Sequence, residues 1–262
     1  MTADIVQLTI HDGIARITLN DPPSLNAFNA AMGARLVEIF DALDADPSVR
    51  AAIMTGAGRG FCSGANLADR AVKQAEGEQD VGAVLEDFVN PLVAALPSRR
   101  VQLVTAVNGP AAGVGLSLAL LGDIIVAAES AFFLLAFSRI GLVPDGGATY
   151  LLPRRIGLTR ATEMALLAER IPAGQAFAWG MVNRVVPDAA LDATATELAT
   201  RLAKGPASLA RTRQLMLGGM HTTLDAQLAG ELANQRWAGG TEDFREGVMA
   251  FLTKRPAQFT GR

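Results

Sequence analysis

The segment AVNGPAAGVGLSLALLGDIIVAAESAFF, residues 106–133, decides the fold. It begins at the end of an apolar run, residues 100–109, which reads as a buried strand. A glycine-containing stretch then leads into a helical segment at 113–123, and two further apolar segments, 124–129 and 131–136, read as strands. Strands alternating with a helix in so short a stretch are typical of an α/β core.

The N-terminal flank continues the pattern. Residues 5–10 and 14–19 alternate apolar and polar side chains around Asp12-Gly13, a dipeptide that favours a tight hairpin turn. A helix is expected after Asn29, ending before Pro47, and a buried strand at 50–58. The helical face consists of Met32, Leu36, Ile39, Phe40 and Leu43.

The rest of the chain divides into a core and a helical part. Residues 67–80 are polar and predict a mobile loop or short helix, and 80–96 predict a helix. From Pro206 onward the chain looks helical, with many apolar positions and few charges. We therefore expect an α/β core at residues 1–200 and a helical oligomerisation region at 201–262 that packs against another element or subunit.

Composition excludes several classes of function. The chain has 262 residues, half of them apolar, and a net charge of −3, which gives no sign of a nucleic-acid surface. No signal peptide is evident, and the apolar stretch 111–128 is interrupted by glycines and an aspartate, so we expect a cytoplasmic protein without a membrane span. One cysteine and two distant histidines make a disulfide, a metal site or a histidine triad poor hypotheses.

Two glycine-containing loops, GRGFCSGANLADR (58–70) and NGPAAGVGLSLAL (108–120), each follow a buried strand. One backbone N–H from each loop, converging on one point, would form a two-donor oxyanion hole. Both loops could instead be plain strand-to-helix turns. A dinucleotide fingerprint is disfavoured, because Gly113-Val114-Gly115 lacks the third glycine and the acidic partner of the ribose.

These motifs carry a resemblance that spans nearly the whole chain. GFCSGANL (60–67), residues 106–133, IGLVPDGGATYLLPRRIG (140–157) and EGVMAFLTKRPAQFTGR (246–262) resemble the crotonase superfamily, the enoyl-CoA hydratase and isomerase family. The nearest branch is that of the epoxyphenylacetyl-CoA and enoyl-CoA isomerases. The resemblance implies a spiral of ββα units with a helical C-terminal part, assembled as a homotrimer or a hexamer. Coenzyme A would belong to an acyl-CoA thioester substrate, with no separate cofactor, metal, nucleic acid or membrane partner.

The resemblance also implies the site. The thioester oxygen would lie between the N–H groups of Ser63 and Val114, with the dipole of the following helix behind it. Substrate contacts would come from the following positions: Leu25, Ala27, Ser63, Ala65, Asn66, Leu67, Gly113, Val114, Ser117, Phe137, Ile140 and Leu142.

Departures from the family pattern bear on the reaction. Ser117 and Phe137 stand where hydratases carry two glutamates, and neither side chain is a general base near neutral pH. Asp145 stands where several isomerases carry an aspartate. An apolar wall of Phe137, Ile140 and Leu142 would raise the pKa of Asp145, which suits a carboxylate that removes a proton from carbon and returns it. Asp145 could alternatively be a helix N-cap.

Other groups have competing interpretations. Cys62 could be a nucleophile or a packed apolar side chain, and the second fits better because no histidine or lysine adjoins it in sequence. His11 and His221 are expected at the surface. Lys254, Arg255 and Arg262 could contact the phosphates of coenzyme A or be surface charge.

Four functions are compatible with these residues. The leading hypothesis is an isomerase that shifts a double bond, or isomerises a ring epoxide, with Asp145 as acid and base. A dehalogenase-type reaction fits less well, because no histidine lies between residues 12 and 220. The alternatives to the isomerase are a hydratase with an atypical site and a non-catalytic acyl-CoA-binding relative.

Overall fold

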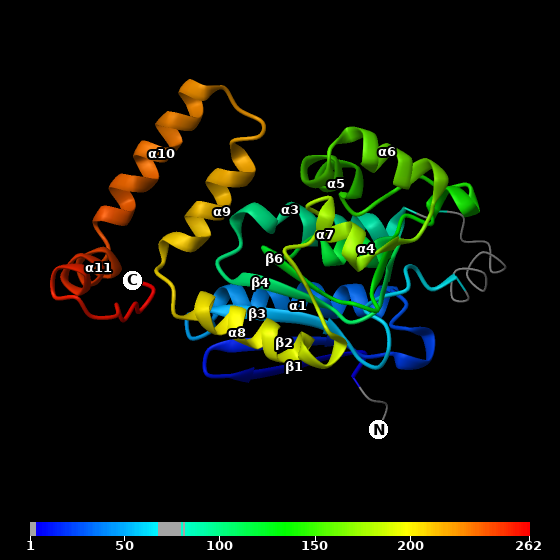
Figure 1. The fold of residues 1–262 in the computed structure, drawn as a ribbon, viewed down its shortest axis with the longest axis horizontal. Coiled ribbons are helices and arrows are strands. Elements are labelled where there is room, and N and C mark those ends of the chain that lie inside the picture. Colours follow the sequence, from blue (N-terminus) through cyan, green and yellow to red (C-terminus); the bar gives the residue numbers. More distant parts are fainter. Residues whose placement is uncertain (1–3, 68–79, 81) are drawn as a thin grey trace.

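The computed structural model describes residues 4–67, 80 and 82–262 (Figure 1). Most of the polar segment predicted as a loop or short helix at 67–80 lies outside the described residues. The main element is a six-stranded sheet in the order β1-β2-β3-β4-β6-β9. Its strands are β1 (Val6–His11), β2 (Ile14–Leu19), β3 (Ala51–Gly56), β4 (Gln102–Val107), β6 (Ile124–Ala128) and β9 (Arg184–Val186).

The first two strands form the predicted hairpin. β1 runs antiparallel to β2, with His11 opposite Ile14, and the turn residues Asp12 and Gly13 have φ of 50° and 73°. Every later strand of this sheet is parallel to its neighbours. All six residues of β4, in the middle of the sheet, are buried, as expected for a parallel strand covered on both faces.

Short strands branch off after the long ones and form a second sheet of β5 (Pro110–Ala112), β7 (Phe132–Leu134) and β8 (Ile171–Pro172). The chain therefore passes from β4 through β5 into the helix α4 (Val114–Ala119), and then from β6 into β7. This confirms the predicted repetition of ββα units. α4 is shorter than the predicted 113–123, because the chain turns at Gly122 toward Asp123, whose carboxylate accepts from Leu103 N–H at 2.8 Å.

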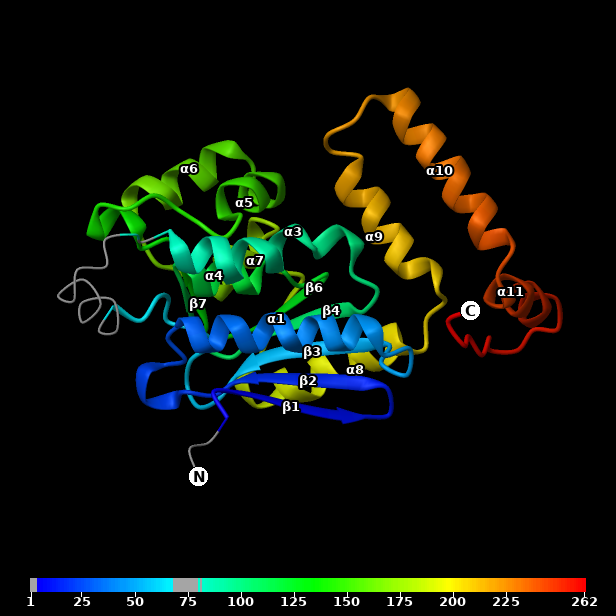
Figure 2. The ribbon, with the colours of Figure 1, turned by 180° about the vertical axis from the view of Figure 1, so that it is seen from behind.

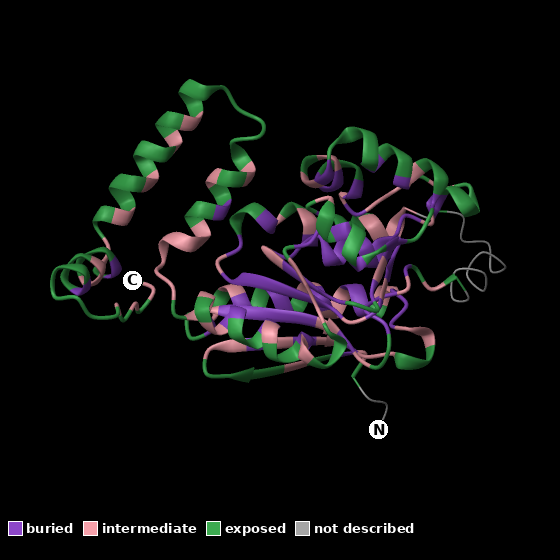
Figure 3. Cartoon of the chain, in the orientation of Figure 1, coloured by how far each residue is buried: buried purple, intermediate pink, exposed green. Residues whose placement is uncertain are grey.

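Helices cover both faces of the main sheet. α1 (Ala30–Ala45) lies on one face and α8 (Leu191–Ala203) on the other, as Figures 1 and 2 show from opposite sides. The predicted start of α1 is confirmed, because the Asn29 side chain accepts from Met32 N–H at 2.9 Å. The predicted face of α1 is buried, and the buried residues gather around the sheet in Figure 3.

The helix predicted at 80–96 is irregular where it is described. It contains a π-helical turn (Leu85–Val89), the short helix α3 (Asn90–Ala94) and a 3-10 turn (Leu96–Ser98). Pro91 has no N–H to donate, which favours such a local change in the ladder. Four further helices among the described residues were not individually predicted: α5 (Ala148–Ile156), α6 (Leu158–Leu167), α7 (Ala173–Ala178) and α8.

The C-terminal arm, residues 206–262, contains α9 (Ser208–Gly218), α10 (Leu224–Gly239) and α11 (Glu242–Leu252). It projects from one end of the sheet, coloured yellow to red in Figure 1, and is largely exposed in Figure 3. No helix among the described residues is long and apolar enough to cross a membrane.

Arg213 on α9 fixes the base of this arm to the sheet. Its guanidinium donates to Asp123 Oδ2 at 3.0 Å, to Val101 O at 3.1 Å and to Arg99 O. The side chains of Arg213 and Asp123 are 7% and 17% exposed. Burial raises the pKa of Asp123, and the charge of Arg213 opposes that shift. An intact buried ion pair of this kind changes the free energy of unfolding little, whereas removing one partner lowers it strongly because a buried charge is left uncompensated.

Asp243 and Glu246 hold the end of the arm. The Asp243 carboxylate is buried and accepts from the N–H groups of Ala207, Thr260 and Gly261. The Glu246 carboxylate accepts hydrogen bonds from the two terminal guanidinium nitrogens of Arg255. It also accepts from Gln258 N–H at 2.8 Å. Acidic side chains near the start of α11 thus organise the closing segment, by bonds that the sequence pattern did not predict.

Arg213→Met should lower the free energy of unfolding by about 3–5 kcal/mol, because it leaves the Asp123 carboxylate buried without its partner. Arg211→Met removes an exposed arginine of the same helix, which stacks 4.8 Å from the Trp237 ring, and should cost about 1 kcal/mol or less. Urea unfolding of both variants measures the difference. Equal costs would show that the Arg213 network does not anchor the arm.

A pH dependence follows from Glu246. Its hydrogen bond with Arg255 is the largest cause lowering its pKa from 4.5 to about 2. A depressed folded-state pKa stabilises the protein above pH 4.5, and this contribution is lost as the pH falls toward 2. The difference in thermal midpoint between wild type and Glu246→Gln should therefore shrink as the pH falls from 5 toward 2. A difference that is independent of pH would contradict this role.

Candidate active site

The two glycine-containing loops lie side by side, at the edge of the sheet where β3 and β4 end. Cys62 forms a parallel bridge with Ala111. Cys62 N–H donates to Pro110 O at 3.0 Å, and Ala112 N–H donates to Cys62 O at 3.0 Å. The first loop thus pairs with β5 like a short extra strand, and the predicted convergence of the loops is confirmed.

The contact between the loops continues beyond the bridge. Two residues further, Gly64 lies against Gly113: a Cβ on Gly113, which has φ of +53°, would be 3.7 Å from Gly64 Cα. Ala65 follows Gly64 in the first loop, and Val114, the first residue of α4, follows Gly113 in the second. Among the described residues, neither of these two N–H groups donates a hydrogen bond to another protein group.

Ser63 does not have the predicted role of N–H donor to a ligand. Its N–H donates to Leu25 O at 3.0 Å, and its hydroxyl donates to Ser24 O at 2.8 Å. Both donors are therefore used to attach the first loop to the segment 24–28. The sequence could not distinguish Ser63 from Ala65, because the difference depends on which residue faces Leu25 across the fold.

Asn26 holds that segment in place and was missed by the sequence analysis. It is fully buried, with φ of 57°, a conformation that asparagine tolerates better than most residues. Its amide donates to Ala57 O at 3.0 Å and Gly60 O at 2.8 Å, and its Oδ1 accepts from Asp21 N–H. Asn26 thereby fixes its neighbours Leu25 and Ala27, of which Ala27 is buried and Leu25 is half-buried.

Asn108 links the ends of β3 and β4 and was likewise missed. Its Oδ1 accepts from Gly56 N–H at 3.1 Å, and its amide nitrogen donates to Gly56 O and Gly58 O, both at 2.9 Å. Its position directly after a buried strand was the only available signal. The hydrogen bonds of Asn26 and Asn108 together fix the position of the first loop relative to the second.

Asp145 lies in the turn that leads into α5, and it is not the cap of that helix. The N-cap position is Gly147, and no side chain caps the helix there. Asp145 contributes its backbone carbonyl, which accepts from Ala148 N–H at 3.0 Å. Its carboxylate is partly buried, with Oδ1 inaccessible to solvent. The N-cap interpretation is therefore wrong.

Ser117 connects this turn to the two-donor site. It lies one helical turn after Val114 on α4, is 1% exposed, and donates its hydroxyl to Asp145 O at 2.9 Å. The chain segment that carries Asp145 is thus bonded to the same short helix that supplies the Val114 N–H. Two ββα repeats meet at this hydrogen bond.

The remaining predicted contact residues differ in their placement. The Phe137 ring is buried against the start of α4, 3.7 Å from a Cβ on Gly113. Leu142 is half-buried, whereas Ile140 is 51% exposed and does not complete the predicted apolar wall, because the chain reverses at Gly141 with φ of +73°. In the first loop, Asn66 N–H donates to Phe28 O at 2.8 Å, and Leu67 is exposed.

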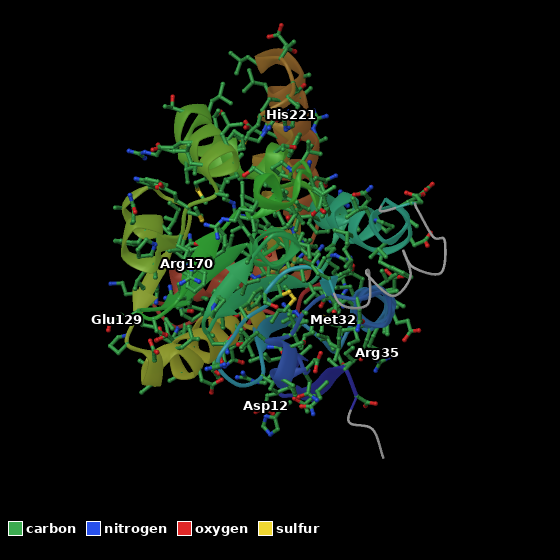
Figure 4. All side chains as sticks on the ribbon, turned by 90° about the vertical axis from the view of Figure 1, so that its right-hand side faces the viewer. Asp12, Met32, Arg35, Glu129, Arg170 and His221 are labelled. Atoms are coloured by element: carbon green, nitrogen blue, oxygen red, sulfur yellow. The ribbon has the colours of Figure 1, made fainter. Side chains whose placement is uncertain are left out.

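The positions of Cys62 and the two histidines argue against roles as a nucleophile or as metal ligands. Burial raises the pKa of the Cys62 thiol to about 11, which confirms a packed side chain over a nucleophile. His221 stacks on Tyr150, with ring centroids 4.9 Å apart, and both histidines are exposed. In Figure 4, His221 lies near the top of the molecule and Asp12, the neighbour of His11, near the bottom. Among the described residues, no cluster of histidine, cysteine and acidic side chains could hold a metal ion.

A large cavity at the opposite edge of the sheet is separate from this site. Its volume is about 820 Å³, and its lining residues precede β3 and β4 or belong to the arm. Arg100 there donates to Val49 O at 2.8 Å and to other carbonyls, and Arg50 donates to Gly205 O at 2.6 Å. Arg100 thus ties together segments of the core, and Arg50 bonds the core to the residue that precedes the arm. Arg255, a predicted contact for coenzyme A, is already paired with Glu246.

Comparison with known proteins finds relatives over nearly the whole chain. The chain is 46% identical to the 1,2-epoxyphenylacetyl-CoA isomerase of Escherichia coli, with 97% of each chain covered. It is 44% identical to a Rhodobacter capsulatus protein named "Probable enoyl-CoA hydratase", over the whole of both chains. A crystal structure of an enoyl-CoA hydratase from Polaromonas sp. JS666 superposes with a TM-score of 0.89 at 30% identity, covering 97% of this chain and 99% of that one.

The family model for enoyl-CoA hydratase/isomerase matches residues 9–262. The paired loops, the ββα repeats and the helical C-terminal part are therefore features of a known fold, with the expected architecture confirmed. This chain belongs to the enoyl-CoA hydratase/isomerase family, and it is an enzyme with the crotonase fold.

Proposed function

We propose that the protein isomerises an acyl-CoA thioester, with Asp145 as the only acid and base. The observation that carries this proposal is the bond between α4 and the Asp145 turn. It ties the backbone of Asp145, whose carboxylate is partly buried, to the helix whose first N–H would form the two-donor site with that of Ala65. Ser117 and Phe137 at the two glutamate positions support isomerisation over hydration, because neither can activate water.

The reaction follows from these groups. The thioester oxygen accepts hydrogen bonds from the N–H groups of Ala65 and Val114, which stabilise negative charge on that oxygen. Asp145 removes a proton from C2 of a 3-enoyl thioester, and the electron pair delocalises onto the oxygen as an enolate. The protonated Asp145, whose proton can exchange with solvent, then delivers a proton to C4, and the double bond moves to C2–C3. Protons and electrons balance without a redox cofactor or a metal, and coenzyme A stays on the substrate.

The names of two relatives suggest two candidate reactions. A relative named 1,2-epoxyphenylacetyl-CoA isomerase suggests a ring substrate, whose isomerisation would use the same two donors. A relative named as a hydratase keeps hydration as the second candidate. Turnover of a linear 3-enoyl-CoA, of a ring epoxide thioester and of crotonyl-CoA separates them. Crotonyl-CoA hydration at about 10 s⁻¹ or more, a rate typical of efficient enzymes, would favour the hydratase.

We also propose that the arm assembles the protein as a homotrimer or a hexamer. Leu224, Leu228 and Leu232 are each more than half exposed and recur every four residues, so they form one apolar stripe along α10. Phe251 on α11 is 84% exposed. A second copy of this chain is the natural occupant, since an apolar stripe on an extended arm is costly to leave in water.

Asp145→Asn should lower the isomerisation rate by about 10²–10⁴-fold, the usual worth of general acid–base catalysis. The thermal midpoint and the affinity for a non-reactive acyl-CoA should stay close to the wild type, because the backbone carbonyl that Ser117 and Ala148 contact is unchanged. Absorbance of the conjugated product measures turnover, and proton NMR in deuterated buffer detects label at C4. A variant that isomerises at nearly the wild-type rate would exclude Asp145 as the base.

Val114→Pro removes the donor and little else, because proline is well tolerated at the first position of a helix. Losing one oxyanion donor should reduce kcat by about 10²–10³-fold. Val114→Ala is the matched control, since it shortens the side chain and retains the N–H. Similar kcat values for these two folded variants would show that this N–H does not contact the substrate oxygen.

Light scattering at micromolar concentration should give three or six times the chain mass of 27.4 kDa. Leu228→Glu places a charge in the middle of the apolar stripe and should shift the mass toward the monomer. Ala233→Glu adds the same charge to an exposed position on another side of α10 and should leave the assembly intact. A monodisperse wild-type monomer is incompatible with the assembly proposal.

A further inference from the structure

The turn that carries Asp145 is held against α4 more tightly than a surface loop requires. Gly146 and Gly147 have φ of +56° and +75°, so both adopt left-handed backbone. A Cβ on Gly146 would lie 2.7 Å from Ser117 Cβ and 3.1 Å from Val89 Cγ1. These contacts bring the backbone of the turn into direct packing with α4 and with the helical segment before α3.

One polar side chain orients the turn within this packing. The Asp145 carbonyl accepts from the Ser117 hydroxyl at 2.9 Å and from Ala148 N–H at 3.0 Å. Two donors on one carbonyl fix the plane of the peptide that follows Asp145. Because the carboxylate begins at the Cα next to that peptide, the direction of the acid depends on a hydroxyl that is itself 1% exposed.

We propose that Ser117 is the positioning residue for Asp145. Resting on the proposed function, this inference gives Ser117 a role distinct from contact with the substrate: its hydroxyl holds the carboxylate at a fixed distance from the Ala65 and Val114 donors. Ser117 and Val114 lie one turn apart on α4, so a single rigid element sets both the oxyanion site and the base. Small displacements of a catalytic group cost large factors in rate, on the order of 10² per ångström.

Ser117→Ala removes the hydroxyl and should lower kcat about tenfold or more, with KM within about twofold of the wild type. Thr105→Val is the matched control. Thr105 is fully buried, and its hydroxyl donates to Ala119 O at 2.9 Å, at the other end of the same helix. It should lower the thermal midpoint while kcat stays unchanged. An equal loss of kcat in both variants would show that Ser117 only stabilises the fold and does not position Asp145.

A double-variant cycle tests whether Ser117 acts through Asp145. In the Asp145→Asn background, Ser117→Ala should have almost no further effect on kcat, because the group that it positions is gone. Independent, additive losses would overturn the inference and indicate a direct contact between Ser117 and the substrate.

Amide hydrogen exchange makes the test independent of activity. Exchange at Gly147 and Ala148 should become faster in Ser117→Ala and not in Thr105→Val. Unchanged exchange in Ser117→Ala would overturn the positioning role. If the wild type fails to isomerise any of the thioesters while exchange still responds to Ser117→Ala, the proposed function is wrong and the structural role of Ser117 is supported.

Discussion

Close approach of two backbone segments is the constraint on which the rest of the site depends. A Cβ on Gly109 would lie 2.2 Å from Arg59 O, and one on Gly115 would lie 2.2 Å from Cys62 O. Any side chain at either position would separate the two loops. Their contact brings Gly64 against Gly113, next to Ala65 and Val114, so the two donors that we propose there are main-chain groups rather than side chains. Both glycines are required for this proximity, and neither needs to touch a substrate.

The division of labour in the site follows from the ββα repeats. In the proposed site, one repeat would bring the loop with the first donor, the next α4 with the second donor, and the following one Asp145. The repeats meet at α4, a helix of only six residues whose members are all buried. A helix so short is stabilised by its packing more than by its own hydrogen bonds. The packing contacts that stabilise α4 in the core therefore also hold the groups of the proposed site in place.

Much of the fold could be predicted, because its signals are local. The hairpin turn at Asp12-Gly13 and the cap at Asn29 depend on residues close in sequence, and both predictions are confirmed. The contact between the two loops was predicted, whereas the choice of residue within the first loop was not correct for Ser63. Ser63 and Ala65 differ only in what lies across from them, and Ser63 is taken by Leu25, 38 positions earlier.

Long-range hydrogen bonds account for the other misses. Asn26 and Asn108 reach carbonyls 31 to 52 residues away, and no periodicity in the sequence marks such partners. Asp145 was open to two interpretations because aspartate before glycine is typical of helix caps. The left-handed Gly147 takes the cap position instead, which sequence propensity alone does not predict.

The contact between Gly146 and Ser117 has a consequence for how such a site can change over generations. A glutamate at 117 must extend from a side chain that already touches the Gly146 backbone, so that substitution alone would push away the turn that carries Asp145. A side chain at 146 is blocked while Ser117 occupies the space. Neither substitution is neutral by itself, and larger side chains at both positions would compete for the same space. The contact therefore couples the two positions, so that each small residue restricts what the other can become.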